Sequence, residues 1–234
     1  MSPLTALDLS KIRFSLRNEW TSNHDCPWCG SDAWSGSSHM QCLNQSCPVQ
    51  AADPLDVVVK VLGLSYEDAD AKSSIAFGRE PSTGRARCRQ DQRAVMDFWI
   101  RQCNRPRTTS EIQVITNLDK QGLNVKSCRF SATIIGRDGM KELRALAADT
   151  GADYPESWDT EVPPPSLVFC VQSVPHTIDR MVIYRGRSAV SVTWRPMRIG
   201  FTGLIGMRPD VPRFLAQDQV AAMRLQLALH TEGV

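Results

Sequence analysis

Four cysteines within residues 26–47 place the strongest constraint on how this chain folds. Two residues separate Cys26 from Cys29, and four separate Cys42 from Cys47. A tetrahedral zinc site needs four such ligands, and each pair can sit on a tight turn, called a knuckle, whose backbone amides face the thiolates. A β-hairpin between the two pairs brings them together. We therefore predict a four-cysteine zinc ribbon in which Cys26, Cys29, Cys42 and Cys47 hold one structural Zn²⁺.

Other roles for these cysteines fit the sequence less well. A pair of disulfides needs an oxidising compartment, which the rest of the chain does not indicate. His24 and His39 flank the site, but four thiolates already complete the coordination of zinc. Within the knuckles, we expect Gly30 to adopt a positive φ angle and Asn44 to take the left-handed conformation in the longer second loop.

Length and composition favour a globular, intracellular protein. The chain has 234 residues, of which 42% are hydrophobic, enough for one large or two small domains with a real core. It has no run of eighteen apolar residues, and its first residues lack the pattern of a signal peptide. The four remaining cysteines are scattered singly, as in a reducing cytoplasm. We expect a soluble, cytoplasmic protein without a membrane partner.

Arginine is concentrated in two stretches, although the net charge is only +2. Residues 79–107 hold eight arginines against three acidic residues, and residues 180–213 hold seven against Asp210 alone. The planar guanidinium suits phosphate contacts and base stacking, but a solvated surface balanced by the acidic stretch 149–161 explains the pattern equally well. Trp34, near the expected hairpin tip, can cover the metal or stack on an unpaired base. The candidate nucleic-acid contacts are Trp34, Arg85, Arg87, Arg89, Arg93, Arg185 and Arg187.

The remaining pattern predicts helices first and strands later. Asp53 with Pro54 begins a helix that Gly63 ends, and Ser65 caps a second one. Further helices are expected over 90–103, 109–122 and 138–150, a short strand over 128–135, and β-rich runs at 167–171, 181–185, 189–194 and 200–205. We expect an α+β chain: a four-cysteine zinc ribbon with flanking helices in residues 1–78, a linker over 79–90, and a mixed α/β domain with a small antiparallel or mixed sheet in 91–234.

The region from residue 24 to about 75 resembles the zinc-binding domain of bacterial and phage DNA primases. In that family a Cys-Pro-x-Cys-Gly ribbon precedes a helix that starts near an acidic residue and ends in Gly-Leu/Val-Ser-aromatic-x-x-Ala. The matching residues are Cys26, Pro27, Cys29, Gly30, Cys42, Cys47, Asp56, Val57, Val58, Leu62, Gly63, Leu64, Ser65, Tyr66 and Ala69. Residues 42–48 are also similar to the second knuckle of the finger in bacterial NAD-dependent DNA ligases. Both relatives bind DNA.

A second, shorter resemblance concerns residues 213–229. They are similar to the opening of a Toprim domain, the metal-binding fold of primases and topoisomerases, in which a strand ends in a glutamate before a helix. Gln217 stands in that glutamate position, and no Asp-x-Asp pair follows it. The resemblance implies Mg²⁺ only where a complete Toprim site exists, because two-metal nucleotidyl transfer needs those carboxylates. No catalytic residue is therefore assigned.

These observations predict a primase-like replication protein of phage, plasmid or other mobile-element type. Its ribbon is expected to contact single-stranded template DNA, while a replicative helicase or polymerase, or residues beyond these 234, supplies the chemistry. Two alternatives stay open. One is a non-catalytic nucleic-acid-binding accessory or regulatory protein that recruits a polymerase or helicase, and the other is a structural zinc protein that makes only protein contacts.

Overall fold

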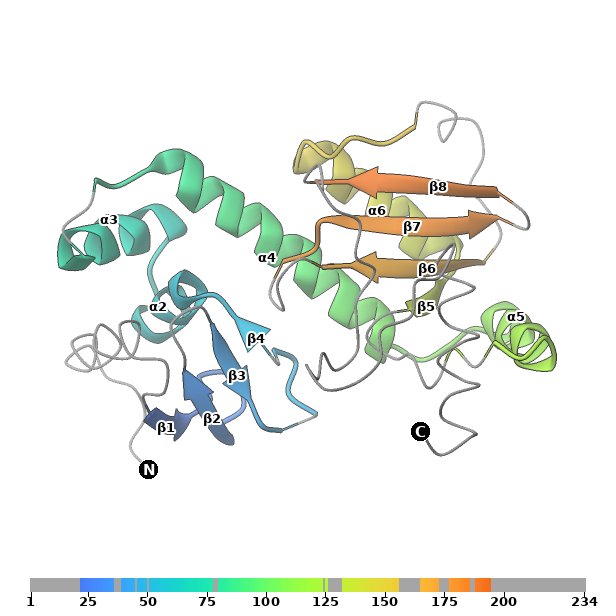
Figure 1. Ribbon diagram of the computed structural model, residues 1–234, viewed down its shortest axis with the longest axis horizontal. Helices are drawn as coiled ribbons and strands as arrows, with labels where there is room; N and C mark the ends of the chain where they lie inside the picture. The colour runs from blue at the N-terminus through green and yellow to red at the C-terminus, as the bar shows by residue number, and fades with distance from the viewer. Residues whose placement is uncertain are drawn as a thin grey trace, which may run out of the picture. The chain divides into compact units, whose positions relative to one another are not determined.

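The computed structural model describes residues 22–194, with gaps at 36–38, 45, 50, 78–79, 124, 126–131, 156–164, 173–176 and 186–187. The chain divides into two compact units (Figure 1). The first unit is made mainly of residues up to Met96 and the second mainly of residues from Asp97 onward. Among the helices of this described part, none is long and apolar enough to cross a membrane.

The first unit opens with a small antiparallel sheet that surrounds the cysteines. Its four strands pair in chain order, each with the next: β1 (Ser22–Asp25), β2 (Asp32–Ser35), β3 (Met40–Cys42) and β4 (Ala51–Ala52). The register places Ala33 opposite Cys42 and Met40 opposite Ala52. All four of these side chains are buried, so the inner face of the sheet and the cysteines form one core. The predicted ribbon is thus present.

Helices α2 (Pro54–Leu62) and α3 (Tyr66–Phe77) follow the ribbon directly. Asp53 and Asp56 form a capping box at the N-terminus of α2. The Asp53 carboxylate accepts a hydrogen bond from Leu55 N at 2.8 Å, and the Asp53 N–H donates to the Asp56 carboxylate at 3.1 Å. Gly63 ends the helix at φ 63°, a left-handed conformation that costs glycine little. The Ser65 hydroxyl accepts from Asp68 N at 3.1 Å. Both predicted caps are confirmed.

Helix α4 (Thr83–Asn104) occupies most of the stretch predicted as a linker. Ser82 acts as its cap, with the hydroxyl accepting from Arg85 N at 3.3 Å, while Ser82 N donates to Asp70 at 2.8 Å. The polar Ser-Thr-Gly sequence therefore starts a helix instead of forming a turn. The linker prediction over 79–90 is wrong for residues 83–90, and the division between the compact units falls later, after Met96. The helix predicted over 90–103 is the second part of α4.

The second unit is built on an antiparallel meander. Its strands also pair in chain order: β5 (Ala132–Ile135), β6 (Ser166–Val171), β7 (Arg180–Arg185) and β8 (Ser188–Thr193). Helix α5 (Thr109–Lys120) precedes β5, and α6 (Arg137–Asp149) connects β5 to β6. The expected α+β class is confirmed, and the sheet is antiparallel. The strand predicted over 200–205, and the Toprim-like segment with Gln217, lie outside the described residues.

The sheet buries both of its faces at the β5–β6 end. On one face Ile134, Leu167 and Phe169 form a core with the half-buried Ile115 and Leu118 of α5. On the other face Ile135 lies close to Gly139 of α6. A Cβ atom at position 139 would come within 2.7 Å of both Ile135 and the Gln102 side chain, so this close approach requires glycine.

A buried polar network joins α4, α5 and α6 within the second unit. Glu111 is fully buried, caps α5 through Thr108 and receives both terminal nitrogens of Arg105. Gln102 accepts from Arg105 Nε at 2.6 Å and donates to Glu142 at 3.2 Å. Burial alone would raise the pKa of Glu111, but hydrogen bonds from Arg105 and Thr108 outweigh it and lower that pKa. The carboxylate thus stays ionised inside the unit.

Replacing Glu111 with glutamine should reduce the free energy of unfolding by about 1–3 kcal/mol at neutral pH, since Arg105 loses its charged partner. The stabilising contribution is full above the ordinary glutamate pKa of about 4.3 and is lost as pH falls through the lower folded-state pKa. Urea unfolding of wild type and Glu111→Gln at several pH values should therefore show the two converging in acid. Glu142→Gln, at a 44% exposed side chain, is the control and should cost less than about 1 kcal/mol. Equal effects of the two variants would contradict this role for Glu111.

Candidate metal centre

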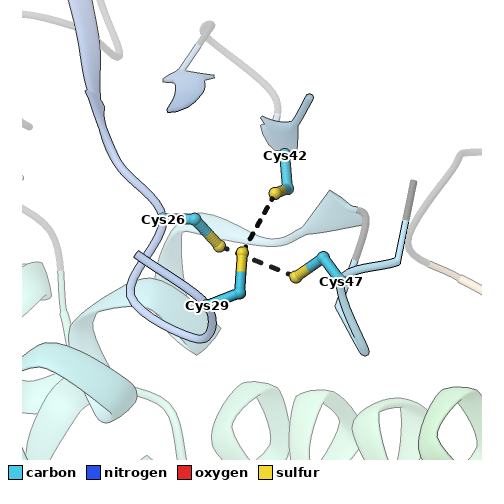
Figure 2. A group of neighbouring side chains, drawn as sticks. All are labelled: Cys26, Cys29, Cys42 and Cys47. Carbon is cyan, nitrogen blue, oxygen red and sulfur yellow. Dashed lines mark hydrogen bonds between the residues drawn. The ribbon is translucent and has the colours of Figure 1, made fainter. Parts of the chain in front are cut away.

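The ribbon brings the four predicted cysteines together. Cys26 follows β1 and Cys29 lies in the turn before β2, whereas Cys42 ends β3 and Cys47 lies in the loop before β4. Figure 2 shows their sulfur atoms pointing toward one another from these separate segments. All four ligand atoms lie within 4.8 Å of one another, and among the described histidine, cysteine and acidic residues this is the group that can hold a metal ion.

The spacing of the sulfur atoms matches a zinc tetrahedron. Cys26 Sγ and Cys47 Sγ are 3.8 Å apart, and Cys29 Sγ and Cys42 Sγ are 3.6 Å apart. A zinc–sulfur bond of 2.3 Å gives a tetrahedron whose sulfur–sulfur edges are about 3.8 Å. A disulfide would hold its sulfurs about 2.05 Å apart, and these cysteines are free thiols. The residues present therefore fit a structural zinc ion.

Backbone amides support three of the four sulfurs in the same way. The sulfur of Cys47 accepts a hydrogen bond from the amide of Val49, two residues later, at 3.3 Å. Cys29 receives the amide of Ser31, and Cys42 receives that of Asn44, again two residues ahead. An amide that donates to sulfur stabilises the thiolate, which is the form that binds metal. The loops are thus shaped for thiolate ligands.

The two knuckles differ in how they turn. The first is closed by Cys26 N donating to Ser31 O at 2.7 Å and by Gly30 at φ 71°, as predicted. In the second knuckle the prediction of a left-handed Asn44 is wrong: among the described residues only glycines have a positive φ. The Asn44 side chain makes the turn instead, accepting from Ser46 N at 2.9 Å and donating to Ser31 Oγ at 3.1 Å. The same side chain therefore bridges the two knuckles.

The thiols differ in acidity in the absence of metal. Burial would raise the pKa of Cys29, but hydrogen bonds from Ser31 and from the neighbouring cysteines lower it to about 6. Burial raises the pKa of Cys42 to about 11 and also raises the pKa of Cys47. Without metal, Cys29 is therefore deprotonated more readily than Cys42 or Cys47. A divalent ion favours the other thiolates by offsetting their mutual repulsion.

Trp28 covers the cysteine cluster from the helix side. It is half-buried and packs against the core formed by the four cysteines and the inner face of the sheet. The guanidinium of Arg93, on α4, lies over its ring at 5.7 Å from the centroid. This packing places the Trp28 indole as a cover over the thiol cluster. Arg93, a predicted nucleic-acid contact, therefore also packs on the indole, which a pattern of charges alone could not reveal.

Arg89 is also placed differently from the prediction. Its side chain is only 8% exposed and its guanidinium grips Asp56 with contacts of 2.8, 3.0 and 3.2 Å. The Tyr66 hydroxyl donates to the same carboxylate at 2.8 Å. Asp56 thereby ties α2, α3 and α4 together. A buried arginine in a fork of this kind cannot reach a phosphate, so its assignment as a nucleic-acid contact is corrected to a structural role.

The remaining candidate contacts are partly visible. Arg87 is exposed on α4. Arg85, 35% exposed, pairs with Asp70 at 3.1 Å and bonds the carbonyl of Glu80 at 3.1 Å. The side chains of Trp34 and Arg185, and all of Arg187, lie outside what the structure describes. Burial lowers the pKa of His39, which is not part of the metal-ligand group found among the described side chains, and the side chain of His24 lies outside them.

Comparisons with known proteins give one finding. No protein-family model and no curated protein matches the sequence. The structure is similar to the crystal structure of the zinc-binding and RNA polymerase domains of the Aquifex aeolicus primase, with 12% sequence identity and a TM-score of 0.45. The similarity covers 82% of this chain and 54% of the primase chain, so this chain spans about half the length of that protein.

Elemental analysis of the purified protein should find one zinc ion per chain, and Cys42→Ser should lose it. Structural zinc supplies on the order of 10 kcal/mol to modules of this kind, so the metal-free ribbon should also unfold. Cys88→Ser is the matched control, because Cys88 is an exposed cysteine on α4 outside the cluster. A metal-free wild-type protein whose ribbon amides remain protected from hydrogen exchange would contradict the assignment.

Proposed function

We propose that this chain is a primase-like replication protein whose zinc-bound ribbon contacts single-stranded template DNA. The observation that carries the proposal is the four-thiol centre, which sits in a ribbon followed directly by the capped helix α2 and by α3. Zinc in this centre acts as a crosslink between four chain segments and does no chemistry itself. The resemblance of residues 24–75 to primase zinc domains suggests that the binding partner is unpaired DNA.

Exposed basic side chains in the first unit support a nucleic-acid partner. Arg87 is exposed on the first part of α4, one turn before the half-buried Asp91, whose carboxyl feels its charge. Arg85 is only partly neutralised, because it remains 35% exposed beside Asp70. Guanidinium groups placed in this way can contact phosphates with little desolvation cost. Arg89 and Arg93 contribute by fixing the ribbon, not by touching DNA.

The wider setting follows from the same proposal. A zinc ribbon without a carboxylate-rich catalytic centre would locate the template, and a replicative polymerase or helicase partner, or a further part of the protein, would extend the primer. A phage, plasmid or other mobile element is the proposed origin. The free thiols of the described cysteines favour the cytoplasm as its compartment.

Fluorescence anisotropy with an unpaired oligonucleotide should show binding that weakens by roughly tenfold or more between about 50 and 200 mM salt. Arg87→Gln should lower the slope of log affinity against log salt by about 0.7, the value for one phosphate contact on a single strand. Lys72→Gln is the matched control, since Lys72 is exposed on α3 in the same unit and the charge change is identical. A wild-type protein that fails to bind even at low salt would favour the purely structural alternative.

These 234 residues should make no primers by themselves. Gln217 offers no charge to a metal ion and no Asp-x-Asp pair follows it in this sequence, so a two-metal reaction lacks its ligands. The assay combines the protein with template, labelled ribonucleotides and magnesium. Primers that appear with wild type and disappear in a variant altered within these residues would reveal a catalytic site and overturn the expectation. DNA binding without primers agrees with either a primase-like subunit or an accessory protein.

A further inference from the structure

One face of the β7–β8 end of the second sheet differs in character from the rest. The register places Arg180, Val182 and Tyr184 of β7 on the same face as Thr193, Ser191 and Ala189 of β8, respectively. This face is the continuation of the apolar core beneath α5, which includes Phe169 and Val182. Toward β8, however, the side chains become small and polar and are half-buried or exposed. Among the described positions of β7 and β8 none on this face is acidic, while the exposed Asp153, bridged to Thr193, lies at its edge.

Arg180 lacks a partner that its position calls for. Its Nε is buried, and in the described structure it has no hydrogen-bond acceptor. No carboxylate among the described residues forms an ion pair with it either. A buried guanidinium nitrogen without an acceptor is costly, and a phosphate oxygen is one acceptor that forms a strong, charge-assisted hydrogen bond with it. The neighbouring Thr193 and Ser191 add short hydroxyl side chains to the same surface.

Tyr184 supplies an aromatic ring on this surface. The ring is half-buried and stands edge-on to Phe169, with centroids 5.4 Å apart and an interplanar angle of 71°. Contact with Phe169 fixes the orientation of the ring, and the opposite residue on β8 is the small Ala189, which leaves space beside it. Tyr184 lies four residues after Arg180 on the same strand, about 13 Å away at 3.3 Å per residue. A phosphate and a base of one short oligonucleotide can therefore reach both.

We propose that this sheet face, made of Arg180, Tyr184, Ala189, Ser191 and Thr193, is a second contact surface for single-stranded DNA. Arg180 binds a phosphate and Tyr184 stacks on a base, while the small side chains of β8 leave room for the DNA. The inference rests on the proposed DNA-binding function but assigns it to residues outside the zinc module. An aromatic platform with an arginine is sequence-tolerant, because every base has a π-face.

The first test is a matched pair of charge variants in the full chain loaded with zinc. The probe is a fluorescein-labelled oligothymidylate of about 16 nucleotides. Arg180→Gln should reduce the slope of log affinity against log salt by about 0.7. Lys141→Gln removes the same charge from an exposed position on α6 and should leave the slope unchanged. Thermal unfolding midpoints of both variants show whether they fold. Equal slopes in the two variants would overturn the role of Arg180.

The second test separates stacking from packing. Tyr184→Phe keeps the ring and should bind like wild type, whereas Tyr184→Leu keeps an apolar contact with Phe169 and should lose about fivefold or more in affinity. Photocrosslinking of wild type to an oligonucleotide containing 4-thiothymidine then needs no variant at all. A crosslink on the tryptic peptide 181–185 supports the proposal. Crosslinks confined to other peptides would overturn it.

The outcomes distinguish this inference from the proposed function. Wild-type protein that binds no oligonucleotide at low salt would remove the proposed function and this surface together. Wild-type protein that binds, while Arg180→Gln matches Lys141→Gln and Tyr184→Leu matches Tyr184→Phe, would remove only the sheet surface. Binding would then be assigned to the ribbon and α4.

Discussion

The convergence of four sulfur atoms is the constraint on which the first unit depends. Strands of two to four residues cannot build a large core, and the inner face of the ribbon consists of small or medium side chains such as Ala33, Met40 and Ala52. The four sulfurs all lie within 4.8 Å of one another, so four thiolates at these positions would repel one another unless a cation lay between them. The i+2 amides at Cys29, Cys42 and Cys47 reduce this repulsion only in part. A zinc ion bound by these four cysteines would therefore stabilise this arrangement of short strands.

A second constraint joins the ribbon to the helices, and it is also electrostatic. Asp56 accepts from Asp53 N at the start of α2, from the Tyr66 hydroxyl on α3 and from the Arg89 guanidinium on α4. One carboxylate thereby fixes the relative arrangement of three helices within the first unit. Trp28 and Arg93 add a contact between α4 and the knuckle. Because both links come from α4, the stretch that looks like a linker in the sequence is an integral support of the metal centre.

Local signals in the sequence predict the local structure well. The Cys26–Cys29 spacing with Gly30, the Asp53-Pro54 start and the Gly63 stop each depend on nearby residues, and the structure confirms each one. The predictions are wrong where a residue's role depends on a partner that is far away in the sequence. Ser82 looks like a turn residue until Asp70 is seen to hold it, and Arg89 looks like a surface charge until Asp56 is seen to bury it. Asn44 shows a third case, since its side chain, not its backbone dihedral, makes the turn. Motif spacing and composition do not predict which distant residues pair in the folded chain.

The same reasoning explains why a count of arginines says little about where nucleic acid binds. Arg89 pairs with the buried carboxylate of Asp56, and Arg105 pairs with that of Glu111. Arg107 donates hydrogen bonds to Ile134 O at 2.7 Å and to the Thr133 hydroxyl. The guanidinium of Arg93 lies over the indole of Trp28. Each of these side chains has exchanged water for a fixed partner, and recruiting it to a phosphate would leave that partner unsatisfied. Arg180 differs from these arginines, because its buried Nε has no hydrogen-bond acceptor among the described groups. An arginine signals a ligand site when its environment has removed water without supplying an acceptor, because an incoming phosphate then repairs a deficit instead of creating one.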